Sequence, residues 1–281
     1  MQKQTIIPEE MLKVAIQAAL DAGREIMKHY DSPLTVEIKE DNSPLTIADR
    51  RAHAIIEKAL KNTAIPVLSE EGSHFTYETR KDLQYLWIVD PLDGTKEFIK
   101  HNGEFTVNIA LIERHKPVLG VIYCPPLKTL YFGSAYQEKA YKILLEKEPI
   151  NVDNLLPGAI QLPLTHTKRP FTVVASKSHL NRETADYIEQ VRKKQGEIDL
   201  VPKGSSLKFC LLAEGTADLY PRFAPTCEWD TAAAQAILET TGGEVVSVDN
   251  FTSLQYNKEN LYNPGFIARR NKSNVSIKNE S

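Results

Sequence analysis

The pattern of apolar positions in the first 62 residues is helical. After Pro8-Glu9-Glu10, a favourable helix start, apolar side chains recur every three or four residues as far as about Tyr30. A second helix is predicted over Thr46–Asn62, after a turn cluster at Asp41-Asn42-Ser43-Pro44. The chain therefore begins with two amphipathic helices.

Beyond residue 64 the apolar positions form short runs that are typical of strands. Leu86–Val89 is apolar throughout, which indicates a strand buried on both faces. The later runs are separated by short turns and predict an antiparallel meander. The strands predicted in this part are Ile65–Ser69, Leu86–Val89, Glu104–Glu113, Pro117–Cys124, Thr129–Ser134 and Lys139–Leu144.

Prolines and scattered polar residues over 146–170 predict an irregular connection, where we place a domain boundary. Residues 1–148 are then an α+β domain, and residues 149–281 are an α/β domain in which strands and helices alternate. The polar tail from Asn271 is expected to be frayed. The alternating elements are Phe171–Ala175 (strand), Asn181–Lys194 (helix), Ile198–Val201 (strand), Ser205–Ala213 (helix), Ala217–Tyr220 (strand), Thr231–Thr240 (helix) and Glu244–Val248 (strand).

Composition narrows the class of protein. A net charge of -3 gives no bulk electrostatic support for nucleic-acid binding, so an anionic ligand needs a locally built site. Three cysteines without metal-ligand spacing indicate reduced thiols, with Cys210 in the core. The N-terminus lacks an apolar leader, and no run approaches the roughly 20 apolar residues of a membrane span. We expect a cytoplasmic protein, with a peripheral contact at the inner face of a bacterial inner membrane and the oligomeric state left open.

The segment after Leu86–Val89 carries the candidate chemistry. The buried strand delivers Asp90 at its C-terminal end, where open α/β sheets place ligands, and Asp93 follows three residues later. Gly94 allows close approach to a ligand, and Thr95 is suited to cap the next helix. An Asp-Gly turn alone is usually only a turn, but the full string is consistent with a metal and phosphate site.

Three further acids fit the same site. Glu70 ends the preceding strand, Asp49 lies within the second helix, and Asp230 is expected to open the helix after it. The alternatives are a solvated loop acid, a helix-surface acid and a plain N-cap, respectively. Clustered carboxylates repel one another, and a divalent cation removes that cost. Oxygen-only ligands select hard cations such as Mg²⁺.

Two long motifs carry a resemblance to a known family. Asp90-Pro91-Leu92-Asp93-Gly94-Thr95 and Trp229-Asp230-Thr231-Ala232-Ala233 resemble the signatures of the inositol monophosphatase-like, lithium-sensitive phosphatases. The similarity covers nearly the whole chain. Further strings resemble the bacterial CysQ-type 3'(2'),5'-bisphosphate nucleotidases; they are Asp41-Asn42-Ser43-Pro44, Leu68-Ser69-Glu70-Glu71, Lys96-Glu97-Phe98-Ile99, Gly103-Glu104-Phe105-Thr106-Val107-Asn108 and Gly204-Ser205-Ser206-Leu207-Lys208-Phe209-Cys210.

The resemblance implies a layered αβαβα sandwich with the active site between its halves. It implies that two or three Mg²⁺ ions are held by Glu70, Asp90, the Leu92 carbonyl, Asp93 and Asp230. It also implies that Thr95, with Asp49 or Glu70 behind it, orients the attacking water. The substrate contacts that it implies are Glu70, Leu92, Asp93, Gly94, Thr95, His179, Ser205, Lys208, Arg222 and Asp230.

The implied reaction is hydrolysis of 3'-phosphoadenosine 5'-phosphate to AMP and phosphate, with inhibition by lithium. Lys208 and Arg222 have the charge to hold the second phosphate. Without the resemblance, each would be interpreted as an ordinary surface cation. Three alternatives stay open: an inositol or sugar monophosphate phosphatase of the same superfamily, a non-catalytic nucleotide sensor, and a scaffolding protein. The last leaves the clustered acids unexplained.

Overall fold

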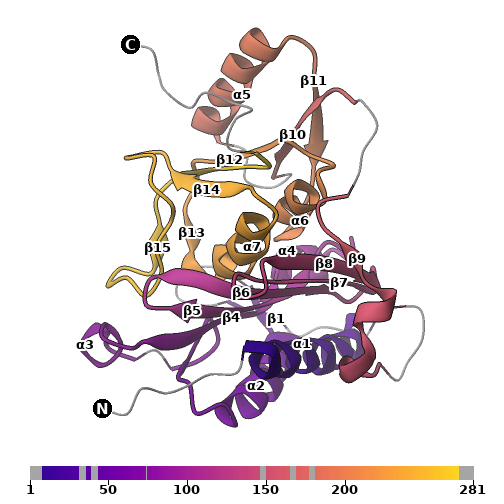
Figure 1. The fold of residues 1–281 in the computed structure, drawn as a ribbon, viewed down its shortest axis with the longest axis vertical. Helices are drawn as coiled ribbons and strands as arrows, with labels where there is room; N and C mark the ends of the chain where they lie inside the picture. The colour runs from indigo at the N-terminus through magenta and orange to yellow at the C-terminus, as the bar shows by residue number, and fades with distance from the viewer. Residues whose placement is uncertain are drawn as a thin grey trace.

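The computed structural model describes residues 8–31, 36–38, 44–73, 75–145, 150–164, 169–176 and 181–271. Within these ranges the chain forms five layers (Figure 1). From one end they are a helix pair, a large sheet, a second helix pair, a small sheet and a last helix. The predicted αβαβα sandwich is confirmed. His179, residues 41–43 and the tail from residue 272 lie outside the described residues.

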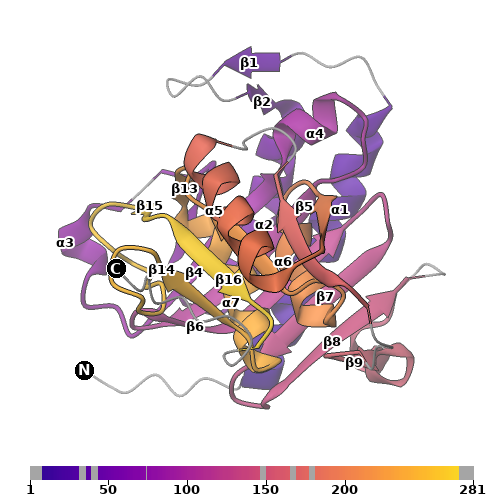
Figure 2. The same cartoon turned by 90° about the horizontal axis from the view of Figure 1, so that it is seen from above.

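The first layer is formed by the two predicted amphipathic helices, α1 (Pro8–Tyr30) and α2 (Ile47–Lys61). Their buried faces pack on one side of the large sheet, where Trp87 and Val89 are fully buried. Pro44, the last residue of the predicted turn cluster, begins the short strand β2 (Pro44–Thr46), which pairs with β1 (Val36–Ile38) (Figure 2).

The large sheet has the strand order β3-β4-β5-β6-β7-β8-β9. β3 and β4 are parallel and the remaining pairs are antiparallel, so the meander is confirmed. β9 follows two 3-10 turns, Val152–Asn154 and Leu156–Gly158, and extends this sheet beyond the proposed boundary at residue 148. The strands are β3 (Val67–Ser69), β4 (Tyr85–Asp93), β5 (Thr106–Glu113), β6 (Lys116–Cys124), β7 (Thr129–Ser134), β8 (Lys139–Leu144) and β9 (Ile160–Gln161).

The second helix pair, α6 (Leu207–Glu214) and α7 (Glu228–Thr240), lies between the two sheets (Figure 1). A Cβ built on Gly120 of β6 would lie 2.1 Å from the carbonyl oxygen of Ala233 in α7. Only glycine allows the helix backbone to approach the strand so closely. The C-terminal half is thereby packed directly on the sheet that carries Asp90 and Asp93.

The small sheet has the order β11-β10-β12-β16-β14, and α5 (Arg182–Gln195) covers its outer face. The sequence pattern missed β16, which lies antiparallel between β12 and β14. The predicted βα alternation therefore ends in a mixed sheet. The strands are β10 (Phe171–Ala175), β11 (Ile198–Pro202), β12 (Leu219–Arg222), β14 (Glu244–Ser247) and β16 (Phe266–Arg269).

Candidate active site between the two halves

β4 delivers two carboxylates through a local irregularity. Asp90 pairs with Asn108 of β5 and Asp93 pairs with Thr106, with a register shift between them. The backbone N–H of Leu92 donates to Asp90 Oδ1 at 3.0 Å. A bulge of this kind redirects side chains at the end of a strand. Both carboxylates therefore leave the same strand end close to each other.

Gly94 and Thr95 follow at the start of the short helix α4 (Thr95–Ile99). Thr95 was predicted to cap this helix; the N-cap is Gly94, with φ +96° and ψ 42°. This left-handed conformation favours glycine, and a Cβ there would lie 3.2 Å from the carbonyl oxygen of Glu104. Thr95 becomes the first helical residue, and its hydroxyl is used elsewhere in the site.

Three carboxylates converge at this point. Ligand oxygens of Asp90, Asp93 and Asp230 lie within 4.8 Å of one another. Asp230 was predicted to precede its helix; α7 begins at Glu228 with Cys227 as N-cap, and Asp230 is the third helical residue. Its Oδ2 accepts from the backbone N–H of Cys227 at 2.7 Å, which is a capping-box bond. The same side chain thus caps its helix and belongs to the carboxylate cluster.

Glu70 is the fourth acid at the same cavity. It follows β3, which is parallel to β4, and its backbone N–H donates to the carbonyl of Val89 at 3.1 Å. Parallel strands end at the same edge, so Glu70 lies beside Asp90. Glu70, Asp90, Asp93 and Asp230 all line one cavity of about 260 Å³.

Burial and mutual repulsion favour the neutral form of two of these acids in the metal-free chain. Burial, followed by the charges of Glu70 and Asp93, raises the pKa of Asp90 well above its ordinary value. Burial and the charges of Asp93 and Glu70 raise the pKa of Asp230 to about 8. The fold therefore holds several carboxyl groups close together although their charges repel. Such a set of oxygen donors fits a hard divalent cation, whose charge would offset the repulsion.

Asp49 and Thr95 meet on the wall formed by the N-terminal half. The Thr95 hydroxyl lies 3.1 Å from Asp49 Oδ1 and 3.3 Å from the carbonyl oxygen of Leu92. Asp49 is buried in the first turn of α2, where its Oδ2 accepts from the backbone N–H and the hydroxyl of Thr46. Both oxygens of this carboxylate are therefore held in fixed directions.

The C-terminal half contributes the cationic wall. Ser205, Lys208 and Arg222 line the same cavity as the acids. Lys208 Nζ donates to the carbonyl of Ser205 at 2.6 Å and lies 5.3 Å from the centre of the Tyr220 ring. Burial lowers the pKa of Lys208 to about 8, against the opposing effect of Asp93. Arg222 donates to the carbonyl of Ala224 at 3.2 Å.

The sequence reading assigned no role to three polar residues that surround Asp93. Asn108 and Thr106 of β5 are buried, and Ser206 precedes α6. Ser206 and Asn108 both donate to Asp93 Oδ2. Thr106 and Asn108 could have been found from the sequence, because both interrupt the apolar run of β5. Polar side chains in a strand that is buried on both faces need hydrogen-bond partners, so their presence indicates a polar site nearby.

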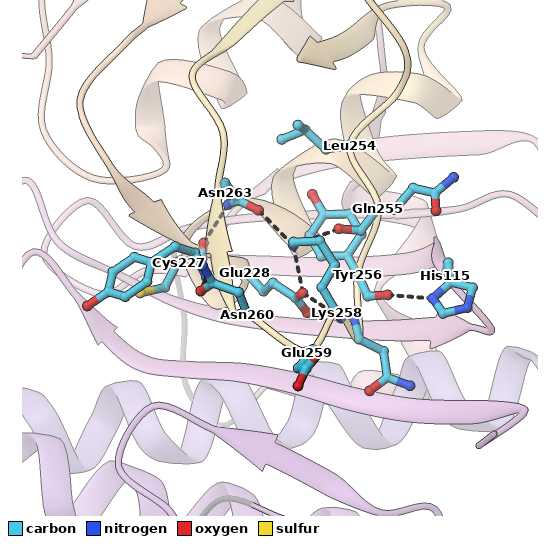
Figure 3. A network of polar contacts seen from close by, with 12 residues as sticks. His115, Cys227, Glu228, Leu254, Gln255, Tyr256, Lys258, Glu259, Asn260 and Asn263 are labelled. Atoms are coloured by element: carbon cyan, nitrogen blue, oxygen red, sulfur yellow. Dashed lines mark hydrogen bonds and ion pairs between the residues drawn. The ribbon is translucent and has the colours of Figure 1, made fainter. Parts of the chain in front are cut away.

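A loop from residues 254 to 263 holds the start of α7 in place (Figure 3). Glu228 is fully buried, and its carboxylate accepts from the backbone N–H groups of Asn257 and Lys258 and from Lys258 Nζ at 2.6 Å. Asn263 Nδ2 donates to the carbonyl of Cys227 at 2.8 Å, and His115 Nδ1 lies 2.8 Å from the carbonyl of Tyr256. The loop thus connects the first turn of α7 to the β5–β6 turn of the large sheet.

Comparison with known proteins agrees with this geometry. The profile of the inositol monophosphatase family matches residues 7–274. The chain belongs to the inositol monophosphatase family. Among relatives in this family, it is 46% identical to the 3'(2'),5'-bisphosphate nucleotidase CysQ of Salmonella typhimurium, covering 91% of this chain and 98% of that protein.

Solved structures of the inositol monophosphatase family have the same fold. CysQ from Bacteroides thetaiotaomicron is 50% identical, with a TM-score of 0.85 over 93% of this chain and 97% of that one. An inositol monophosphatase from Zymomonas mobilis is 25% identical, with a TM-score of 0.71 over 95% of each chain. Among the helices of the described ranges, none has the length and apolar content that crossing a bilayer requires.

Proposed function

We propose that the protein is a Mg²⁺-dependent 3'(2'),5'-bisphosphate nucleotidase that hydrolyses 3'-phosphoadenosine 5'-phosphate to AMP and phosphate. The observation that carries this proposal is a cavity with clustered carboxylates on one wall and Lys208 and Arg222 on another. Such a cavity can hold a metal-bound reacting phosphate and a second, non-reacting one. The relative at 46% identity is named a 3'(2'),5'-bisphosphate nucleotidase, which supports this class of substrate.

The metal site in this proposal consists of Glu70, Asp90, the Leu92 carbonyl, Asp93 and Asp230, holding two or three Mg²⁺ ions. The donor set fits, since oxygens of three of these carboxylates lie within 4.8 Å of one another. When bound, Mg²⁺ supplies positive charge that acidifies water and offsets the charge on the transferring phosphoryl group.

The residues of the N-terminal half position the water and the reacting phosphate. Thr95 Oγ1 is held 3.1 Å from Asp49 Oδ1, so its lone pairs and hydrogen have fixed directions. We assign to this pair, with Glu70, the orientation of the attacking water in line with phosphorus. Gly94 and Thr95 offer backbone N–H groups to the phosphate oxygens.

The residues of the C-terminal half hold the nucleotide. Lys208 and Arg222 provide charge-assisted bonds to the second phosphate. Ser205 lines the cavity, but its hydroxyl donates to Asp93 Oδ2 at 2.7 Å, so we assign its substrate contact to the backbone and its hydroxyl to Asp93. His179 stays a prediction of the sequence, as do the cytoplasmic location, the peripheral membrane contact and the division into two domains at residue 148.

A phosphate-release panel tests the proposal. It compares 3'-phosphoadenosine 5'-phosphate with inositol and sugar monophosphates, each with and without Mg²⁺. We expect Mg²⁺-dependent, lithium-sensitive release with the highest kcat/KM on the bisphosphate nucleotide and loss of activity in Asp93→Asn. A higher kcat/KM on an inositol monophosphate would select the superfamily alternative, and tight nucleotide binding without turnover would select the sensor.

A further inference from the structure

We propose that Ser206, supported by Asn108, is a positioning residue that fixes Asp93 and Asp230 at the spacing required for metal binding. The inference rests on the metal site of the proposed function and adds to it a residue outside the predicted ligand set. The relevant contacts connect three elements: the end of β4, the middle of β5 and the turn before α6.

One oxygen of Asp93 receives an unusual number of donors. Asp93 Oδ2 accepts from the Ser206 backbone N–H at 2.7 Å and the Ser206 hydroxyl at 2.9 Å. It also accepts from the Ser205 hydroxyl at 2.7 Å and from Asn108 Nδ2 at 3.3 Å. These four contacts share the lone pairs of Oδ2, and we therefore assign Oδ1 as the oxygen that faces a cation. The direction of the carboxylate is therefore set by its neighbours before any metal binds.

The Ser206 hydroxyl also reaches the second half of the acidic cluster. Its oxygen lies 3.2 Å from the carbonyl oxygen of Asp230 and accepts from Asn108 Nδ2 at 2.9 Å. The single hydroxyl hydrogen is shared between Asp93 and the Asp230 backbone. Ser206 thus connects a ligand from β4 with a ligand from α7, and these ligands belong to opposite halves of the chain.

The hydroxyl has no role in its own helix. Ser206 is the N-cap of α6, where a serine side chain ordinarily accepts a backbone N–H of the first turn. Here it makes no such cap bond, and its hydrogen is directed to the acids instead. Ser206 has helical backbone angles (φ -67°, ψ -5°) rather than the extended ones of a capping serine, so its side chain is available to the carboxylate.

Contacts on both sides of the turn fix the position of Ser206. Ser205 has φ +51°, a conformation that costs energy for a residue with a side chain. Gly204 N donates to Glu104 Oε2 at 2.8 Å, and a Cβ on Gly204 would lie 2.9 Å from that of Glu104. On the other side, Thr106 Oγ1 lies 2.9 Å from Asn108 Oδ1, which orients the amide so that Nδ2 faces Ser206. The turn is thus held from both sides.

The test measures Mg²⁺ binding by titration calorimetry without substrate, together with the Tm of the chelated protein, for the parent and Ser206→Ala. We expect about tenfold weaker Mg²⁺ binding in the variant, since outer partners of metal ligands typically contribute 10- to 100-fold in affinity. Because the substitution removes no bond that caps α6, the Tm of the variant measured with a chelator should differ little from that of the parent. A decrease in affinity of less than threefold would overturn the inference, whatever happens to the Tm.

Ser134→Ala is the matched control. Ser134 is buried in β7, and its hydroxyl makes no hydrogen bond within the described ranges, so its removal should leave Mg²⁺ affinity unchanged. Should Ser206→Ala fail to fold, Ser206→Cys keeps a side chain of similar shape but a weaker donor to Asp93 and Asp230, and it carries the same expectation and threshold. Absence of Mg²⁺ binding in the parent would contradict the metal site itself, which separates failure of the proposed function from failure of this inference.

Discussion

The Thr95 hydroxyl donates to the Asp49 carboxylate across 46 positions of sequence, with 3.1 Å between Oγ1 and Oδ1. We expect Thr95→Val, which is nearly isosteric, to lower kcat by about 10²- to 10⁴-fold, the usual contribution of a positioned proton-transfer group. Thr95→Ser keeps the hydroxyl and should retain most of kcat. Steady-state kinetics at saturating Mg²⁺ measures both variants. Equal activities of the valine and serine variants would contradict the role.

Asp49 is the partner in the same pair and also serves the capping box of α2. Asp49→Asn keeps an acceptor for Thr46 but removes the charge that faces Thr95. We therefore expect a large decrease in kcat with a small change in Tm and in Mg²⁺ affinity. A loss of Tm large enough to explain the loss of activity would mean that Asp49 acts through the helix alone.

The acidic cluster predicts a pH-dependent effect of Mg²⁺ on stability. The pKa of Asp230 is raised from 3.8 to about 8 in the folded chain, and that of Asp90 is raised as well. The folded chain therefore binds these protons more tightly than the unfolded chain. This stabilisation is complete below about pH 4 and is lost as the pH rises through about 8.

Differential scanning calorimetry between pH 6 and 9 measures this effect. We expect the Tm of the chelated protein to fall over this range, by about 2–4 °C for each kcal/mol lost, and the rise in Tm caused by Mg²⁺ to grow. In Asp230→Asn the slope should be shallower. A Mg²⁺-induced rise in Tm that is independent of pH would count against clustered, protonated carboxyls.

Lys208 predicts a pH limit for binding of the second phosphate. Its pKa is lowered to about 8, so the ammonium charge is lost as the pH rises above that value. We expect KM for the bisphosphate to rise above pH 8, and Lys208→Met to raise KM by about 10- to 100-fold at pH 7, the size of one charge-assisted bond. Adenosine 3'-monophosphate, which lacks the second phosphate, is the control substrate. An identical pH dependence of KM for both substrates would refute the assignment.

The loop in Figure 3 predicts where stability is concentrated. Glu228 is fully buried and Lys258 is its only side-chain cation among the described residues, at 2.6 Å. Lys258→Met leaves the carboxylate with two backbone donors and no opposite charge, so we expect a loss of about 2–4 kcal/mol. The double variant Glu228→Gln/Lys258→Met should lose less than the sum of the single variants. Denaturant unfolding at fixed Mg²⁺ concentration measures all three, and strict additivity would show that the pair is not coupled.

The close contact between α7 and β6 predicts that stability is sensitive to substitution at Gly120. Gly120→Ala places a Cβ 2.1 Å from the Ala233 carbonyl oxygen, so either the helix or the strand must move. We expect a loss of about 3 kcal/mol from overpacking and weaker Mg²⁺ binding, because α7 carries Asp230. Gly158→Ala is the control, since a Cβ there meets nothing within 4 Å. Similar unfolding free energies for the two variants would contradict the close packing.

Local patterns in the sequence predicted most elements, because periodicity and turn chemistry act over a few residues. Leu86–Val89 was identified as a buried strand, and β7, β8 and β10 match their predicted bounds. The predicted starts of some helices differ from the observed ones. α7 begins at Glu228 rather than Thr231, because Cys227 and the contact of Asn263 with its carbonyl fix the first turn from outside the helix. β16 was missed because its place between β12 and β14 depends on partners distant in sequence.

The sequence by itself determined the chemistry of the protein: which carboxylates follow buried strands, and therefore which oxygen ligands are available. Only the tertiary structure decided how those oxygens are directed. Asp93 Oδ2 is held by donors from β5 and from the turn before α6, and Asp230 reaches the same cavity because α7 lies against Gly120. The physical reason is that a strand end or a helix turn is specified by adjacent residues, whereas the orientation of a carboxylate is specified by whichever donors the packed fold brings to it.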